Sequence, residues 1–391
     1  MDAELTARRG LIDQLIEGGL IRSDRVLRAF ERVRRSAFIP DAPLEEVYAD
    51  RTHTVAEDDG VKVSTVSAPS MQAKMLELVD PAPGEDVLEI GSGGTNAALL
   101  AEMVAPGGSV WTVDIDERVI ERARASLTQH PTPVPVRADV VDAWAPGTAI
   151  TEASFDLVEF TVDTWTFPEW LLDVLRPGAR VVAPLSLFEC GWAFTFDEGR
   201  LRGTRVFTGG FVAARGAGAS GTEPRYARAG DIWLARDQDA DDGWLSSVLA
   251  REGESVETGL RLTAGSLYSP VILRLFAGSE SAGTIRSESQ SREHGFPGAP
   301  WTGTPVWLAD DGLAVMDNRR VDGGVEVFVR AFGDDGADLA QRMAERLRTW
   351  RQDVGEPVCE AIPVSAVREA APEGVRVIRR GAWEFRLSWE R

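Results

Sequence analysis

Residues 87–103 read VLEIGSGGTNAALLAEM, and this segment decides the fold. A short apolar run with the pattern of a buried strand ends at Ile90, and glycines follow at positions 91, 93 and 94. A helical pattern begins immediately after them. Glycine lacks Cβ, so its backbone can approach a ligand closely. A strand, a glycine turn and a helix in direct succession predict the first unit of a nucleotide-binding sheet.

The alternation of strands and helices continues beyond this segment. Further strands are expected at SVWTVDI (109–115), VPVRADV (134–140), FDLVEFTV (155–162) and RVVAPL (180–185), with helices at 117–127 and 168–175. This order predicts a parallel, doubly wound α/β sheet of the Rossmann-like type. Its ligands should bind at the carboxyl ends of the strands.

Small residues dominate the stretch ARGAGASGTEP at 214–224, where we place a domain boundary. Residues 1–214 are expected to form the ligand-binding domain. Residues 215–391 contain strand-like runs and one amphipathic helical pattern (Leu339, Met343, Leu347, Trp350), so they predict an α+β accessory domain.

Composition narrows the class of protein. The net charge of −20 disfavours a nucleic-acid partner. No apolar run has membrane-spanning length, and the charged N-terminal stretch is unlike a signal peptide, so a cytoplasmic protein without a membrane partner is expected. Two distant cysteines and three scattered histidines predict neither a disulfide framework nor a metal site.

Three acidic residues end predicted strands of the sheet. Glu89 precedes the glycine turn, Asp114 ends the second strand, and Asp139 closes the third. Asp114 is placed to accept hydrogen bonds from ribose hydroxyls, and Asp139 to meet an adenine amino group. The glycine spacing does not fit a dinucleotide site, whereas an acid before the turn suits a cationic cofactor such as S-adenosylmethionine. Each acid also has a plainer interpretation, as a solvated strand end or a turn residue.

Several segments in this order carry a family resemblance: DRVLRAFERVRRSAFIP, VYADRTHTV, STVSAPSMQAKML and VLEIGSGGTNAALLAEM, followed by ADVVDAW and LRPGARVVAPL. Together, over residues 5–214, they resemble the protein-L-isoaspartate (D-aspartate) O-methyltransferase family. The resemblance implies the same fold, S-adenosylmethionine as cofactor with S-adenosylhomocysteine as product, and esterification of a side-chain carboxylate in a peptide.

The resemblance also assigns site residues. It implies that Ser67 is the active-site hydroxyl, in an element TVSAP that includes Thr65 and Val66 on the substrate side. The cofactor-binding set that it implies comprises Glu89, Gly91, Ser92, Gly93, Asn96, Asp114, Ile115, Asp139 and Val140. Tyr48 and Asp50 match a Tyr-x-Asp element expected to tie the N-terminal segment over the cofactor.

The chain departs from the family pattern at four places. The glycine loop is one residue shorter and has Thr95 in place of a tyrosine, and Ala213 replaces a proline. Asp163 and Trp165 follow the fourth strand where small residues are usual, so they are expected to shape the substrate side. The small repair enzymes also lack residues 215–391.

These departures resemble a branch of the family that modifies ribosomally made peptides. Members of that branch esterify an aspartate of a precursor peptide, often one already macrocyclised as a lanthipeptide, graspetide or lasso peptide, and the ester closes to an aspartimide. The resemblance makes such a peptide the expected partner. The size of residues 215–391 and their tryptophans predict that this region recognises the peptide, the alternative being that the tryptophans only fill a core (Trp233, Trp301, Trp307, Trp383, Trp389). A monomer or small homo-oligomer is expected.

Several alternatives remain open at this point. Ser67 could cap the helix that follows it, Asp163 could cap a helix near Pro168, and Trp165 could be a core residue. The whole chain could be a general isoaspartate repair enzyme, a non-catalytic peptide-binding protein or a nucleic-acid methyltransferase.

Overall fold

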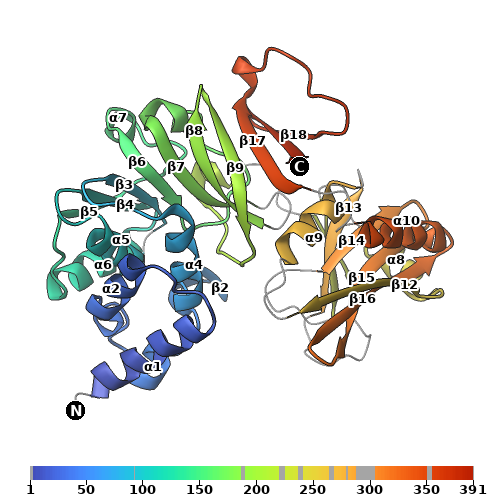
Figure 1. Cartoon of the computed structure of the whole chain (residues 1–391), viewed down its shortest axis with the longest axis horizontal. Coiled ribbons are helices and arrows are strands. Elements are labelled where there is room, and N and C mark those ends of the chain that lie inside the picture. The colour runs from blue at the N-terminus through green and yellow to red at the C-terminus, as the bar shows by residue number, and fades with distance from the viewer. Residues whose placement is uncertain are drawn as a thin grey trace.

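The computed structural model describes residues 3–91, 93–185, 190–219, 225–236, 241–263, 268–278, 281–287, 304–349 and 355–390. None of the helices in these ranges is both long and apolar enough to cross a membrane. Figure 1 shows two units side by side, with the helical N-terminal segment beneath the first of them.

The N-terminal helices pack on the first sheet through a shared apolar core. Their bounds are α1 Ala3–Glu17, α2 Asp24–Arg32, η1 Arg35–Ala37, α3 Leu44–Val47 and α4 Pro69–Val79. Ser23 caps α2 by accepting a hydrogen bond from the Val26 amide. The segment between α3 and α4 forms a hairpin of β1 (His53–Asp58) and β2 (Val61–Val66), which the sequence did not indicate.

The predicted doubly wound sheet is confirmed. Its parallel strands are β3 Asp86–Ile90, β4 Ser109–Asp114, β5 Val136–Val140, β6 Phe155–Phe160 and β7 Leu175–Leu185. They lie in the order β5-β4-β3-β6-β7. The chain therefore changes direction across the sheet between β3 and β6, and a crevice for ligands is expected above these two strands.

Three helices connect these strands: α5 Thr95–Met103, α6 Glu117–Gln129 and α7 Thr148–Thr151. The helix predicted at 168–175 is only a single 3₁₀ turn, η2 Leu171–Val174. Its sequence is apolar because Leu171 and Val174 are fully buried in the core of the sheet, not because a longer helix forms.

Antiparallel strands extend this sheet to ten strands. β8 (Cys190–Asp197) and β9 (Arg200–Phe207) follow β7, and β17 (Glu356–Pro363), β19 (Trp383–Glu390) and β18 (Arg376–Arg380) complete the order. The last strands of the chain thus pair with β9 in the first unit. This differs from the predicted division at residues 214 and 215, which assigned everything after 214 to an accessory domain.

The second unit is a seven-stranded antiparallel sheet in the order β10-β11-β13-β14-β15-β16-β12. Its strands are β10 Arg225–Ala229, β11 Ile232–Arg236, β12 Val256–Thr263, β13 Ala282–Ser287, β14 Thr304–Ala309, β15 Gly312–Val321 and β16 Gly324–Gly333. Helix α8 (Asp242–Leu249) covers one face. Helix α10 (Gly336–Arg348), which buries the predicted Leu339, Met343 and Leu347, covers the other. Trp350 lies outside the described residues.

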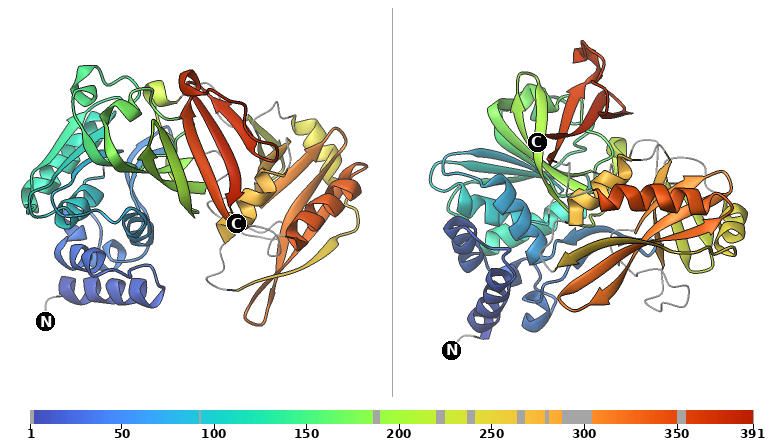
Figure 2. Two further views of the ribbon diagram at one scale, coloured as in Figure 1. Left: turned by 45° about the horizontal axis from the view of Figure 1, so that its top comes forward. Right: turned by 45° about the vertical axis from the view of Figure 1, so that its right-hand side comes forward.

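Helix α9 (Tyr268–Phe276) belongs to both cores. Ile272 and Leu273 are buried in the core of the ten-stranded sheet, whereas Val271 and Leu275 are buried in the core of the second sheet. Both views of Figure 2 place the C-terminal strands at the edge of the first sheet that faces the second unit. The two sheets are therefore joined by shared packing as well as by the chain.

Candidate cofactor and substrate site

The turn after β3 can be built only from glycine at its first position. Gly91 has φ +94°, and a Cβ there would lie 2.7 Å from Thr161 Oγ1 and from Val162 Cγ1. Gly93 faces the end of β2, where a Cβ would lie 3.4 Å from Val66 Cγ2. Ser92, a predicted cofactor residue, lies outside the described residues. Glycine therefore lets the turn pass close to the end of β2 and to the segment after β6, where side chains on the turn would be crowded.

A cleft opens at the carboxyl ends of the strands beside this turn. It is lined by Val63, Ile90, Gly91, Val113, Asp114, Ile115, Val141, Asp142, Ala143, Trp144, Val162, Ala213, Ala214 and Arg215. The predicted residues Gly91, Asp114 and Ile115 thus lie together in one cleft. Its position above β3 and β4 matches the location expected for a nucleotide in this fold.

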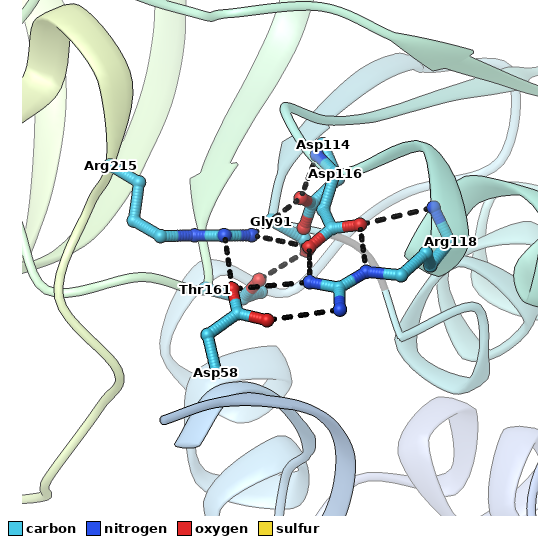
Figure 3. A network of polar contacts seen from close by, with 7 residues as sticks. All are labelled: Asp58, Gly91, Asp114, Asp116, Arg118, Thr161 and Arg215. Carbon is cyan, nitrogen blue, oxygen red and sulfur yellow. Dashed lines mark hydrogen bonds and ion pairs between the residues drawn. The ribbon is translucent and has the colours of Figure 1, made fainter. Parts of the chain in front are cut away.

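Asp114 lies at the edge of a charged network that is centred on Asp116 (Figure 3). One of its oxygens accepts a hydrogen bond from the Asp116 amide at 2.9 Å, and Arg215 Nη2 lies 3.9 Å from the same oxygen. Arg215 also pairs with Asp116 at 3.1 Å and with Asp58 of the β1–β2 hairpin at 3.7 Å. Arg118 joins the same two acids from α6.

Asp116 is the N-cap of α6, accepting a hydrogen bond from the Arg118 amide. Hydrogen bonds from Arg118 and then Arg215 lower the pKa of its carboxyl far below the usual range. Asp116 is therefore ionised at neutral pH, and it holds Arg215 beside Asp114. Sequence reasoning missed Arg215 because its partners lie 99 or more residues away along the chain and only folding brings them together.

Arg215 belongs to a segment, residues 212–218, that we call the cleft strap. The Asp163 amide donates to Val212 O at 2.8 Å, and the Ala214 amide donates to Asp163 O at 3.0 Å. Farther along, the Ala217 amide donates to Asp142 Oδ2 at 2.8 Å. The strap also leads out of the first unit toward β10, so the connection to the second sheet runs along the cleft.

Asp139 and Val140 are not among the residues that line the cleft. The Asp139 carboxylate accepts hydrogen bonds from Trp111 Nε1 at 3.0 Å and Arg124 Nη2 at 3.1 Å, and it also pairs with Arg137. Its carboxylate is thus already paired with side chains of β4, β5 and α6. Asp142, three residues later in the segment ADVVDAW, lies in the cleft instead.

Glu89 is completely buried beneath the glycine turn, as is Glu159 of β6. The two are direct neighbours in the register of β3 and β6. Glu89 Oε2 accepts a hydrogen bond from Thr112, but Glu89 Oε1 and both Glu159 oxygens have no partner among the described residues. Asn96, at the start of α5, is also buried, and neither atom of its amide has a hydrogen-bond partner of good geometry there.

Burial raises the pKa of both carboxyls. The pKa of Glu89 rises to about 7, and that of Glu159 rises to about 8, where repulsion from Glu89 adds to burial. The Asn96 amide and, for Glu89, the Thr112 hydroxyl oppose the shift. The pair therefore holds at least part of its protons at neutral pH. The sequence showed Glu89, but Glu159 was seen only as part of a strand.

Ser67 lies between β2 and α4 with a half-buried side chain. The N-cap of α4 is Ala68, which makes no side-chain hydrogen bond, and Asp50 Oδ1 instead accepts from the Ser70 amide at 2.9 Å. The capping alternative for Ser67 is therefore wrong. Within the part of the chain that the structure describes, nothing hydrogen-bonds the Ser67 hydroxyl.

Buried Arg35 holds the backbone of this element in place. Its guanidinium donates to Ser67 O at 2.9 Å, Gln72 Oε1 at 3.0 Å, Val47 O at 3.0 Å and Arg51 O at 3.3 Å. Burial lowers the pKa of Arg35 to about 10, so it remains cationic at neutral pH. Tyr48, predicted to tie down the N-terminal segment, does so by donating to Glu4 of α1 at 2.8 Å.

Thr65 and Val66 differ in accessibility. Thr65 is half-buried and pairs with Thr54 across the hairpin. Val66 is buried, with 1% of its surface exposed, and packs against Gly93. Val66 thus positions the element against the glycine turn, whereas Thr65 and Ser67 retain exposed surface.

The loop after β6 carries Asp163 and Trp165. Asp163 pairs through its backbone with the cleft strap, and η2 has Trp170 as N-cap, so Asp163 does not cap that turn. The Arg380 guanidinium lies 3.1 Å from the centroid of the half-buried Trp165 ring. Arg380 precedes β19, so the C-terminal strands brace the loop at the edge of the site.

The donor set of the site suits a cationic nucleoside. It offers a glycine turn, a carboxylate at the end of β4, an apolar wall at Ile115 and Trp144, and two buried carboxyls with unpartnered oxygens. No cluster of His, Cys, Asp or Glu in the described ranges could hold a metal ion. These features fit a small organic cofactor with positive charge.

Comparisons with known proteins find relatives of the N-terminal half of this chain. The sequence profile of the family "Protein-L-isoaspartate(D-aspartate) O-methyltransferase" matches residues 6–197. The protein-L-isoaspartate O-methyltransferase of Methanopyrus kandleri is 36% identical over 183 residues, which cover 46% of this chain and 76% of that protein. The enzyme of the same name from Aeropyrum pernix is 36% identical over 180 residues, covering 46% and 66%.

Among solved structures, a putative protein-L-isoaspartate O-methyltransferase from Plasmodium falciparum, in complex with S-adenosyl-L-homocysteine, aligns with a TM-score of 0.47 and 20% identity. It covers 53% of this chain and 98% of that chain.

Proposed function

This chain belongs to the protein-L-isoaspartate(D-aspartate) O-methyltransferase family, and from that premise we propose that it esterifies an aspartate or isoaspartate side chain of a ribosomally made, constrained peptide. The chain is a protein carboxyl O-methyltransferase, and its cofactor is S-adenosylmethionine. When bound, this cofactor supplies an electrophilic methyl group on a sulfonium.

The chain's own residues account for cofactor binding as follows. Gly91 and Gly93 allow close approach of the cofactor at the turn. Asp114 can accept hydrogen bonds from ribose hydroxyls when the Arg215 guanidinium moves away from its carboxylate. Asp142 and Ile115 line the wall of the cleft expected to meet the base. Glu89 and Asn96 supply polar atoms beneath the turn.

The carboxylate that is methylated needs little activation. An aspartate has an unperturbed pKa near 3.9 and is ionised at neutral pH. The protein's task is to position one of its oxygens and to exclude water. The Ser67 hydroxyl, left free by the α4 cap and held through its backbone by Arg35, is suited to donate a hydrogen bond to that carboxylate. In the ester, the next backbone nitrogen can displace methanol and close the imide.

The observation that carries the peptide-tailoring proposal is the way residues beyond 214 enter the site. Arg380 covers Trp165 in the loop after β6, and Arg215 leads the chain out along the cleft. Small repair enzymes need no such addition, so a wall built from the extra residues supports a special substrate. The alternative, a general isoaspartate repair enzyme, is consistent with the names of the relatives.

Steady-state kinetics on two peptides distinguish the two functions. The release of S-adenosylhomocysteine gives kcat/KM for a linear isoaspartyl peptide and for a macrocyclic aspartyl peptide. The proposal predicts a strong preference for the macrocyclic aspartyl peptide. A preference for the linear isoaspartyl peptide would make the enzyme a repair methyltransferase.

A Trp165→Ala variant tests in the same assay whether the loop after β6 sets the peptide preference. Under the proposal it reduces kcat/KM for the macrocyclic peptide more than for the linear one, because Trp165 lies on the wall braced by the C-terminal strands. An equal reduction for both peptides would remove the specificity role of this wall.

A further inference from the structure

Glu89 and Glu159 occupy the two strands that flank the point where the sheet changes direction. They are register neighbours on β3 and β6, and both are completely buried. Ligands of open α/β sheets bind above this switch point. The pair therefore lies directly beneath the region where the cofactor is expected.

Buried polar atoms without partners are unusual in folded proteins, and here five such atoms occur on neighbouring residues. They are Glu89 Oε1, both carboxyl oxygens of Glu159, and the two amide atoms of Asn96. Asn96 is 7% exposed and influences both carboxyls from the start of α5. A buried, unsatisfied cluster of this kind needs an explanation such as a ligand or a proton held between the groups.

The charged group that acts on the pair is negative, and no basic side chain among the described residues neutralises the pair. On β4, Asp114 adds negative potential at Glu89, and on β7 the register neighbour of Glu159 is the apolar Val182. Across the described ranges, no arginine, lysine or histidine pairs with either carboxyl. Two carboxylates at such a site cannot both ionise without a cation, so protons substitute for that cation.

We propose that Glu89 and Glu159 hold protons between them until a cationic ligand arrives, so that binding of the cofactor releases protons from the pair. This inference rests on the proposed cationic cofactor but not on the identity of the peptide. Both S-adenosylmethionine and its product carry an ammonium group, so each binds with proton release. The released protons pass to the solvent, and the pair keeps the negative charge that faces the ligand.

The raised pKa values of the two carboxyls set the pH range of this coupling. Below about pH 7 the pair is protonated and binding must expel a proton, so affinity rises with pH. One linked proton changes the dissociation constant by up to about tenfold for each pH unit. Above about pH 8 the pair is already ionised, and the pH dependence levels off.

The test is calorimetric titration of the whole chain with S-adenosylhomocysteine, which binds without reacting, in two buffers of different ionisation enthalpy. At pH 7 the wild type should release about one proton for each ligand bound. Glu159→Gln should release fewer protons, because it removes one of the two carboxyls that hold them. Glu169→Gln, a change at an exposed glutamate, should leave proton release unchanged.

Two results would overturn the inference: a wild type whose binding enthalpy is the same in both buffers, or a Glu159→Gln variant that releases as many protons as the wild type. Glu159→Leu repeats the test with an apolar residue should the glutamine variant fold poorly. The calorimetric experiment contains no peptide, so a negative result would not bear on the proposed methyl transfer. Conversely, an enzyme that fails to methylate the peptides could still release protons when it binds the cofactor.

Discussion

Single residues of this site are defined by the polar groups that the fold leaves without partners. The Ser67 hydroxyl is not used to cap α4, and the carboxyls of Glu89 and Glu159 lie buried side by side. The backbone around Ser67 is hydrogen-bonded by Arg35 and Asp50, and Glu89 and Glu159 lie in the paired strands β3 and β6, so the unpartnered side-chain atoms do not reflect a disordered backbone. These groups are available to form hydrogen bonds with a substrate and a cofactor.

Ser67→Ala should lower kcat on the physiological peptide on the order of 100-fold, as the loss of one oriented donor does elsewhere. Affinity for S-adenosylhomocysteine should remain unchanged, because the hydroxyl is assigned to the substrate carboxylate. Steady-state kinetics and calorimetry measure the two effects. Parallel losses in both would refute the assigned role, and Ser70→Ala, which keeps the backbone bond to Asp50, is the matched control.

The buried carboxyl pair predicts how stability depends on pH. Both folded-state pKa values are raised above those of the unfolded chain, so the folded protein holds more protons than the unfolded one between about pH 4.5 and 8. The contribution of the pair to stability is complete below the unfolded pKa and is lost as pH rises through 7 and 8. Thermal melts should therefore show a fall in Tm across this range that is smaller in Glu159→Gln. A wild-type contribution that grows with pH would contradict this assignment.

Individual elements are held at the site by a few buried or paired arginines. Arg35, from η1, joins the end of α3, the entrance to β1 and the TVSAP element through four hydrogen bonds. Arg215 joins the cleft strap to the end of β4, the cap of α6 and the β1–β2 hairpin. Charge-assisted contacts thus add to the shared apolar core in positioning the elements around the cleft.

Arg35→Met should destabilise the protein by about 3 kcal/mol, because it leaves several buried acceptors unsatisfied, each costing about 1–3 kcal/mol before relaxation. It should also lower kcat by releasing the Ser67 backbone. Denaturant unfolding and steady-state kinetics together check this. Arg34→Met, at an exposed neighbour whose ion pair with Glu4 is at the surface, should cost less than about 1 kcal/mol. Equal destabilisation by both changes would show that the buried hydrogen bonds of Arg35 contribute little.

The extent to which the sequence predicted these elements follows from the range of the interactions. The five parallel strands were predictable because a buried strand followed by a helix leaves a local pattern. The single turn at η2 was not, since Leu171 and Val174 are apolar for tertiary reasons. Asp142 rather than Asp139 lines the cleft, and only the folded structure shows which of these two nearby aspartates does so. Glu159 and Arg215 matter because of partners that are distant in sequence.

At the scale of the whole molecule, the chain leaves the first sheet, builds the second and then returns. β17 pairs with β9, and Trp383 and Phe385 fill the core of the first sheet. Helix α9 contributes buried residues to both cores. A boundary near residue 214 was the natural prediction from composition, because pairing between strands about 150 residues apart leaves no local signal.

Trp383→Ala should destabilise the catalytic unit by about 3–5 kcal/mol, the usual cost of removing a fully buried large aromatic side chain. The ring also contacts Phe167 in the loop after β6, so kcat/KM for the peptide should fall as well. Thermal unfolding and kinetics at a temperature where the variant is folded separate the effects. Trp389→Ala, at a partly buried position of the same strand, is the control and should cost less. A variant of Trp383 with wild-type stability would show that the C-terminal strands are not integral to this unit.

The most direct test of the central claim is time-resolved mass spectrometry of a macrocyclic aspartyl peptide incubated with the enzyme and S-adenosylmethionine. We predict that a species heavier by one methyl group appears first, and that it then gives way to a species lighter than the starting peptide by one water. Ser67→Ala should delay the first species. A peptide that stays unmodified while a linear isoaspartyl peptide is methylated under the same conditions would contradict the proposed function.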